Sequence, residues 1–123
     1  MHTLDARIDT ARIGRGVHVV ALGGEIDLHT APRLDEALFG AIHEGAERVL
    51  VDLAGTTFVD STVLGVLLRA HRRLDDSGGR LVLVSNDPRI LRTLELTGLD
   101  RTLAVEPTLT ETVASLSVDG NGA

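Results

Sequence analysis

The sequence of 123 residues contains no cysteine, tryptophan or tyrosine, and its twelve basic residues are all arginine. The lack of cysteine excludes disulfides and thiol chemistry. The lack of lysine, together with the lack of a Gly-x-x-x-x-Gly-Lys-[Ser/Thr] loop, counts against a P-loop nucleotide site. Two phenylalanines offer no stacking platform for bases, and a net charge of −6 repels phosphate backbones. Nucleic acid is therefore not expected as a direct partner.

The sequence also lacks an apolar stretch long enough to cross a bilayer, so we expect no membrane partner. Its first residues show neither the basic nor the apolar region of a secretory signal, which predicts a cytoplasmic protein. The five histidines are scattered, without a His-x-x-x-His pair, and we expect no metal site and no cofactor. With 43% hydrophobic residues, the chain can build the core of one globular domain.

Hydrophobic patterning predicts five strands. Two alternating runs lie within residues 4–23, and Gly14-Arg15-Gly16 between them indicates a turn that joins two strands. Residues 48–53 form a short and nearly continuous apolar run, which is typical of a strand buried on both faces. We expect this strand in the centre of the sheet. Residues 80–84 and 103–105 predict two further strands.

Four helices are predicted around these strands. Apolar residues at helical spacing indicate helices over residues 30–45 and 61–77. Asp87-Pro88 opens the third helix as N-cap and first residue, and Thr108 to Glu111 match a capping box at the start of the fourth. The resulting order, ββαβαβαβα, separates the later strands by helices. This order favours right-handed crossovers and a largely parallel sheet.

The chain is therefore predicted to form a single α/β domain over residues 1–117, with one mixed, largely parallel sheet and its helices. From Val118 onwards the residues are rich in glycine and small polar types. This composition predicts a flexible C-terminal tail at residues 118–123. No internal repeat or linker divides the chain.

The loop and helix start after the central strand contain the residue of greatest interest, Ser61. A serine at the start of a helix faces free backbone N–H groups and the positive end of the helix dipole, so Ser61 can cap the helix or hold a phosphate there. From the pattern alone, a plain N-cap is the more common role. Thr62 has the same ambiguity, and Asp27, in a turn after two glycines, is more often structural than functional.

Enzyme functions have less support from the residues. A serine hydrolase needs a base held against its nucleophile, yet Ser61 lies outside any Gly-x-Ser-x-Gly elbow. Asp52 or Asp60 at a strand end would suit a phosphoaspartate receiver, but the acidic cluster and the lysine of that class are missing. A small α/β hydrolase or a nucleotide-binding enzyme stays open as an alternative, because a fold does not fix a function.

Several motifs together resemble the STAS domain of bacterial anti-sigma factor antagonists, over roughly residues 5–117. The residues are Gly24-Glu25-Ile26-Asp27, Phe58-Val59-Asp60-Ser61-Thr62 with Leu64-Gly65, and the segment from Ser85 to Leu99. Each motif is short. Their order, spacing and placement on one predicted edge of the sheet make the joint match specific.

The resemblance implies a binding module and not an enzyme. In that family, the serine after the aspartate is phosphorylated by an anti-sigma factor that is itself an ATP-dependent serine kinase. The unphosphorylated form binds this kinase and frees the sigma factor, which regulates transcription. Carried over to this chain, the resemblance implies Ser61 as the phosphoacceptor and Thr62 as a secondary acceptor.

The resemblance also implies a partner-binding surface made of the loop at residues 24–30, the loop at residues 58–62 and the exposed face of the helix that begins at Ser61. The predicted partner-binding residues are Glu25, Asp27, Phe58, Asp60, Ser61, Thr62 and Arg69.

Arg69 belongs to a basic stripe with Arg72 and Arg73, at helical spacing. Arg72 is also placed to pair with Asp76 along the same helix. Most such stripes are simply solvated faces. A role in binding a partner is considered because this helix starts at Ser61.

One position departs from the family pattern. The family usually has glycine directly after Ser-Ser or Ser-Thr, whereas this chain has Val63, which adds a β-branched side chain in the first helical turn. A kinase that approaches closely there would phosphorylate Ser61 more slowly, or a different partner would be selected. The alternative within the family is a phosphorylation-independent STAS adaptor of a transporter or sensory complex, whose partner would ignore the charge on Ser61.

Overall fold

The computed structural model describes the backbone of residues 6–122 and the side chains of residues 6–116. Within these residues, strands and helices follow the predicted order ββαβαβαβα, with one short 3-10 helix, η1, in addition. The elements are β1 (Arg7–Arg12), β2 (Val17–Gly23), α1 (Ala31–His43), β3 (Arg48–Gly55), α2 (Ser61–Asp76), β4 (Arg80–Val84), α3 (Pro88–Thr97), η1 (Leu99–Arg101), β5 (Ala104–Glu106) and α4 (Leu109–Gly122).

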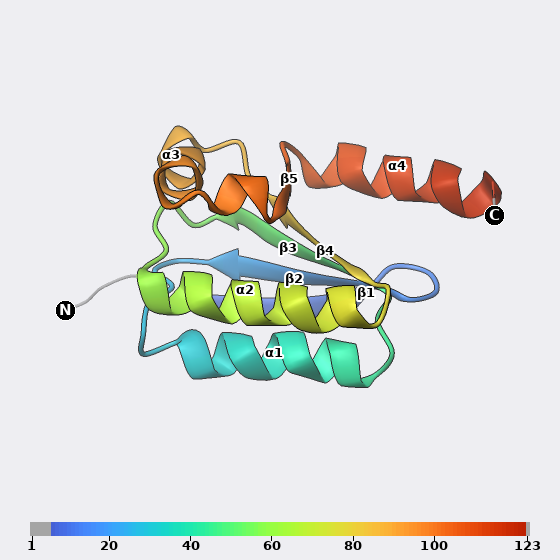
Figure 1. The fold of residues 1–123 in the computed structure, drawn as a ribbon, viewed down its shortest axis with the longest axis horizontal. Coiled ribbons are helices and arrows are strands. Elements are labelled where there is room, and N and C mark those ends of the chain that lie inside the picture. Colours follow the sequence, from blue (N-terminus) through green and yellow to red (C-terminus); the bar gives the residue numbers. More distant parts are fainter. Residues whose placement is uncertain (1–5, 123) are drawn as a thin grey trace.

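The strands form one sheet in the order β1-β2-β3-β4-β5 (Figure 1). β1 and β2 are antiparallel, and each of the other neighbouring pairs is parallel. β3 lies in the centre, as its apolar run predicted, and Val49, Leu50 and Val51 are fully buried there. The predicted α/β fold with a mixed, largely parallel sheet is confirmed.

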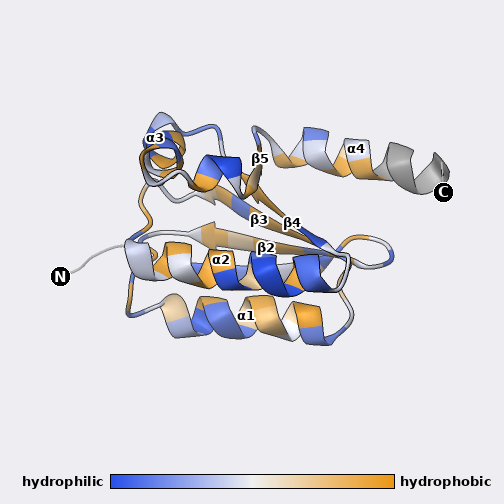
Figure 2. Ribbon diagram, in the orientation of Figure 1, coloured by the Kyte–Doolittle hydropathy of each residue, from blue (hydrophilic) through white to orange (hydrophobic). Residues whose placement is uncertain are grey.

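Helices cover both faces of the sheet. α1 and α2 lie side by side on one face, and α4 lies on the other (Figure 1). Side chains alternate along β3 because successive residues of a strand point to opposite faces. Val49 and Val51 therefore join the core beneath α1 and α2, whereas Leu50 packs with α4. In Figure 2, α1 and α2 are banded with hydrophobic and hydrophilic residues, as expected for amphipathic helices that cover a sheet.

The start of α4 follows the predicted pattern in part. Thr108 Oγ1 accepts a hydrogen bond from the backbone N–H of Glu111 at 3.2 Å, which is one half of the predicted capping box. The predicted apolar face, formed by Leu109, Val113 and Leu116, packs against the sheet. The helix continues to Gly122, past the predicted boundary at residue 117, and the flexible tail stays a prediction. None of the helices within the described residues is long and apolar enough to cross a membrane.

The ends of α3 are those that the sequence predicts. Asp87 is the N-cap and accepts a hydrogen bond from the backbone N–H of Arg89 at 2.8 Å, and Pro88 is the first helical residue. Gly98 ends the helix in the left-handed conformation with φ of 75°. That conformation favours a residue without a side chain.

Candidate partner-binding surface around Ser61

The loops after β2 and β3 are joined beyond the regular part of the sheet. The backbone N–H of Gly24 donates to the carbonyl of Gly55 at 3.1 Å, and Ile26 and Val59 form an isolated parallel bridge. A Cβ on Gly55 would lie 2.7 Å from the carbonyl oxygen of Leu22, so only glycine allows the two chains to come this close. The two predicted loops therefore lie next to each other at the carboxyl ends of β2 and β3.

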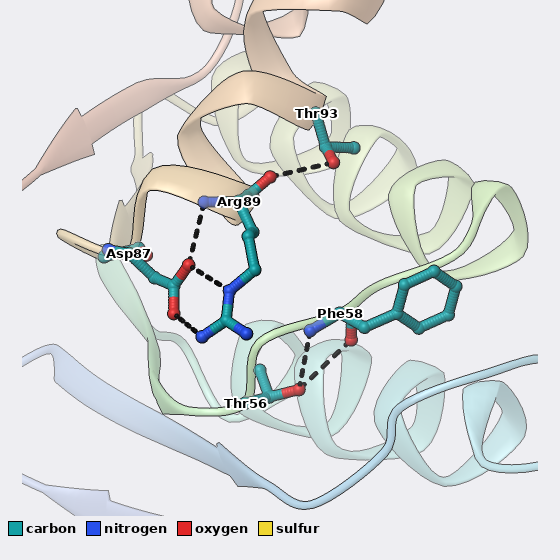
Figure 3. A network of polar contacts seen from close by, with 6 residues as sticks. Thr56, Phe58, Asp87, Arg89 and Thr93 are labelled. Carbon is teal, nitrogen blue, oxygen red and sulfur yellow. Dashed lines mark hydrogen bonds and ion pairs between the residues drawn. The ribbon is translucent and has the colours of Figure 1, made fainter.

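This bridge fixes two exposed hydrophobic side chains. Ile26 and Val59 are buried in the core, whereas Leu28 and Phe58 are each 57% exposed. Buried Thr56 shapes the loop by donating from its hydroxyl to the carbonyl of Phe58 at 3.1 Å (Figure 3). In Figure 3 the Phe58 ring points away from this contact. The loops thus present apolar surface next to a buried bridge.

α2 begins at Ser61, as predicted, and the residue before it provides the cap. Asp60 is the N-cap, and its Oδ1 accepts a hydrogen bond from the backbone N–H of Val63 at 2.9 Å. Ser61 is the first helical residue, so the alternative interpretation of Ser61 as a plain N-cap is wrong. Its side chain is exposed and makes no hydrogen bond within residues 6–116, and Thr62 is also exposed. The capping carboxylate therefore leaves the Ser61 hydroxyl free.

Val63 has a structural role. Its side chain is fully buried and belongs to the core that α2 shares with the sheet. The side chain points into the core and not towards solvent, and the expectation that Val63 slows phosphorylation or selects a different partner stays a prediction. The substitution of the usual family glycine adds apolar burial beneath Ser61.

The two acidic residues of the loop after β2, Glu25 and Asp27, have different roles. Asp27 Oδ1 accepts a hydrogen bond from the backbone N–H of His29 at 2.9 Å, and its backbone N–H donates to Thr30 Oγ1 at 2.9 Å. Thr30 occupies the predicted N-cap position of α1, but its hydroxyl makes these turn contacts and no capping bond. Half-buried Asp27 therefore shapes the turn, whereas Glu25 is exposed beside it.

Arg69 lies further along α2 and is held by α1. Its Nη2 is 3.0 Å from Oδ1 of Asp35, and both side chains are largely exposed. Such a surface pair contributes roughly 0.2–1 kcal/mol. The predicted pair of Arg72 with Asp76 is not formed among the described residues, because no nitrogen and oxygen of the two come within 4.0 Å. Arg69 therefore connects two helices at the margin of this surface.

The start of α3 carries an ion pair that sequence reasoning missed. Asp87 accepts hydrogen bonds from Arg89 Nε at 3.1 Å and from Arg89 Nη2 at 2.9 Å, as Figure 3 shows. The hydrogen bonds from the Arg89 side chain hold the pKa of Asp87 below its ordinary value, and the same contacts raise the pKa of Arg89. The sequence signal for this ion pair was the spacing of Asp87 and Arg89. An N-cap residue and the second helical residue lie on the same turn, so their side chains can meet.

The geometry offers a surface for a protein partner and little for catalysis or a metal. Among residues 6–116, no three His, Asp or Glu side chains gather in a way that would hold a metal ion. The structure brings Glu25, Asp27, Phe58, Asp60, Ser61 and Thr62 to neighbouring loops at one edge of the sheet. Their acidic character combines with the exposed Leu28 and Phe58.

Comparisons with known proteins agree with this architecture. Residues 9–115 match the family model of the STAS domain. The anti-sigma-B factor antagonist of Staphylococcus epidermidis is 36% identical over 80 residues, which cover 65% of this chain and 74% of that protein. The crystal structure of an anti-sigma factor antagonist from Mycobacterium paratuberculosis is 30% identical, with a TM-score of 0.80 over 90% of this chain and 93% of that one.

A more distant structure shares the fold alone. It is the Bacillus cell fate determinant SpoIIAA in its phosphorylated form, 23% identical, with a TM-score of 0.73 over 89% of this chain and 99% of that one. The match to the family model covers most of the chain. The predicted resemblance is confirmed: this chain belongs to the STAS-domain family.

Proposed function

We propose that this chain is an anti-sigma factor antagonist that acts in the cytoplasm, binds an anti-sigma factor serine kinase while Ser61 is unphosphorylated, and is released when Ser61 is phosphorylated. The observation that carries the proposal is the exposed Ser61 hydroxyl, left free because Asp60 caps α2. The names of the similar proteins support the antagonist role. Freeing a sigma factor through capture of its inhibitor would make the chain a regulator of transcription.

The phosphoryl transfer requires an accessible hydroxyl and an ATP supplied by the partner. Ser61 Oγ would attack the γ-phosphorus of that ATP, the bond to the ADP oxygen would break, and the hydroxyl proton would pass to a base of the kinase. Ser61 has no hydrogen bond to give up within the described residues. Thr62, exposed at the next position, is the secondary acceptor.

A phosphate at Ser61 should change binding far more than folding. It adds roughly 1.5 to 2 negative charges. The helix N-terminus favours these by roughly 0.3–1 kcal/mol, whereas the neighbouring carboxylate of Asp60 opposes them. These two effects nearly cancel within the domain. At an interface, a charge buried without its partner costs several kcal/mol, so the complex is what the phosphate disrupts.

The loops around Ser61 suit an apolar contact with an acidic margin. Leu28 and Phe58 are exposed side by side with the buried bridge, and large exposed apolar side chains of this kind commonly anchor protein interfaces. Glu25 and Asp60 add negative charge beside them. The partner surface should therefore be apolar at its centre and basic at its margin.

The test is a pull-down from the native cell lysate with wild type, Ser61→Ala, Ser61→Asp and Thr62→Ala as baits, read by mass spectrometry. Thr110→Asp is the matched control, because Thr110 is an exposed hydroxyl residue in the first turn of another helix, α4. We expect wild type, Ser61→Ala and Thr110→Asp to retain an ATP-binding anti-sigma factor, and Ser61→Asp to lose it while its melting temperature stays near that of wild type.

Two outcomes would contradict the proposal. If Ser61→Asp and wild type retain the same partner, the chain is a phosphorylation-independent adaptor of a transporter or sensory complex. If Ser61→Asp unfolds, the charge acts on the fold and the switch is not confined to an interface. Incubation of the purified partner with ATP then decides directly whether Ser61 is the main acceptor, since Ser61→Ala should take up far less phosphate than wild type and any remainder should be on Thr62.

A further inference from the structure

A hollow lies away from Ser61, between β1 and α1. It has a volume of about 430 Å³, and its floor is formed by Ile8 and Thr10 of β1 and by His18 of β2. One wall is the side of α1 between Arg33 and Glu44. We call it the β1–α1 groove. Its volume lies within the range of roughly 300–1,000 Å³ that small-molecule sites occupy in proteins.

His18 is the first sign that this groove has a ligand. Its side chain is only 7% exposed, faces the α1 side of the sheet like Val20, and lines the groove. Neither ring nitrogen makes a hydrogen bond within residues 6–116. The other buried polar side chains of that part of the chain are all hydrogen-bonded, namely Thr56, Ser85 and Thr112. A buried polar group without a hydrogen-bond partner is unfavourable, so a ligand that forms hydrogen bonds with His18 would be stabilising.

Gly40 is the second sign. It lies inside α1 and lines the groove, and its φ is not positive. A Cβ built on Gly40 would meet no atom within 4 Å, so neither backbone conformation nor packing requires glycine here. Glycine within a helix is less stable than alanine. Its missing side chain instead keeps the groove open between Ala37 and Ala41, which also line it.

The charges around the groove balance. Arg12 and Glu44 form an ion pair of 2.8 Å at one end. The hydrogen bond from Arg12 is the main reason why the pKa of Glu44 lies below its ordinary value. Arg33 and Glu36 bring one positive and one negative charge to the wall. Two cations and two anions leave no net charge to attract an ionic ligand.

We propose that the β1–α1 groove binds a small neutral molecule with an amide group for His18 and an apolar ring that rests against Ala37 and Ala41. A neutral imidazole donates through one nitrogen and accepts through the other, and an amide offers the complementary carbonyl and N–H. Ile8 completes the apolar side of the site. This site shares no residue with the surface around Ser61, so it does not depend on the function proposed for that surface.

The test is an NMR titration of the full chain with benzamide, followed at the backbone amide of Gly40 and the ring of His18. Benzoate and benzylamine serve as negatively and positively charged probes of the same size. We expect saturable shifts with benzamide, with a Kd on the order of 1 mM for so small a molecule. The charged probes should bind at least several-fold more weakly.

Three variants separate a ligand site from a packing defect. Gly40→Leu fills the groove and should abolish the benzamide shifts, whereas Gly40→Ala adds one carbon to the wall and should only weaken them. His18→Phe should fold at least as stably as wild type, because it removes an unpaired polar group, and should lose the response. Absence of saturable shifts, equal binding of all three probes, or unchanged benzamide binding in Gly40→Leu and His18→Phe would each overturn the proposal.

Discussion

The starts of α2 and α3 share the same capping arrangement but present different side chains to the surroundings. Each helix follows a strand of the parallel sheet, is capped by an aspartate, and buries a β-branched residue at its third position, Val63 in α2 and Ile90 in α3. In α3 the capping carboxylate of Asp87 also forms an ion pair with Arg89. In α2 the carboxylate of Asp60 makes its capping bond but no ion pair within the described residues.

This difference shows how one helix start comes to expose a free hydroxyl while the other does not. An N-cap aspartate accepts a hydrogen bond from a free backbone N–H group of the first helical turn. The side chain of the next residue is then not needed for capping. At α3 that next position is Pro88, which has no polar side chain. At α2 it is Ser61, whose hydroxyl is exposed. The same capping arrangement therefore leaves no side-chain hydroxyl at the first position of α3 and an exposed one at the first position of α2.

The largest effect should come from the buried residue that the two starts share. Val63→Gly should lower the free energy of unfolding by about 3 kcal/mol, from lost burial and from glycine in a helix. Ile90→Gly should lower it by a similar or slightly larger amount. Denaturant unfolding measures both. If Val63→Gly costs less than about 1 kcal/mol, the start of α2 is held by its cap and not by its core contact, and the likeness to α3 fails.

A smaller effect, on partner binding and not on stability, should distinguish the surface at the start of α2 from that of α3. Phe58→Ala should weaken the complex with the captured anti-sigma factor by about 2 kcal/mol, or roughly 30-fold, because it removes an apolar anchor next to Ser61. Leu96→Ala is the control, since Leu96 is 70% exposed on α3. Calorimetry with the purified partner gives both affinities. Equal losses in the two variants would place the partner over α3 as well, and the distinction between the two starts would disappear.

The cap of α2 should contribute less. Asp60→Ala should lower the free energy of unfolding by about 1 kcal/mol, because the backbone N–H of Val63 loses its acceptor. Asp60→Asn keeps an acceptor oxygen and should stay close to wild type. Denaturant unfolding of both variants measures the difference. A loss of equal size in Asp60→Asn would show that the charge of Asp60, and not its capping bond, stabilises this helix start.

Much of the fold could be predicted because burial leaves a clear pattern along the chain. The continuous apolar run at residues 48–53 placed β3 in the centre of the sheet, and the Asp87-Pro88 pair gave the start of α3. The start of α2 was harder, because Asp60 and Ser61 are both good capping residues. The burial of Val63 fixes the helix register and thereby selects Asp60. Reading Val63 as part of the apolar face would have revealed this.

The parts that could not be predicted depend on contacts between elements distant in sequence. Arg69 pairs with Asp35 because α1 and α2 lie side by side, whereas the sequence suggested only a local pair of Arg72 with Asp76 along one helix. The groove that contains His18 likewise needs β1 and α1 to be placed together. Periodicity describes one element at a time, so it identifies faces but not their neighbours.

The smallest effect concerns the ion pair that closes the start of α3. Arg89 holds the pKa of Asp87 below its ordinary value, so the contribution of this carboxylate to stability is present above the unfolded pKa and is lost as the pH falls through the folded pKa. Arg89→Gln should move the pKa of Asp87 back towards that ordinary value, as measured by NMR titration of the carboxyl carbon. Unfolding free energy should change only slightly, because the pair is exposed and screened by salt.

Arg92→Gln is the control for this titration, since Arg92 is exposed on the same helix and forms no ion pair with any residue between 6 and 116. It should leave the pKa of Asp87 in place. If both variants move that pKa equally, the general positive charge of α3 acts on Asp87 and the Arg89 contact does not close the cap. The two helix starts would then differ only in the side chain at their first position, and the exposed hydroxyl of Ser61 alone would distinguish α2 from α3.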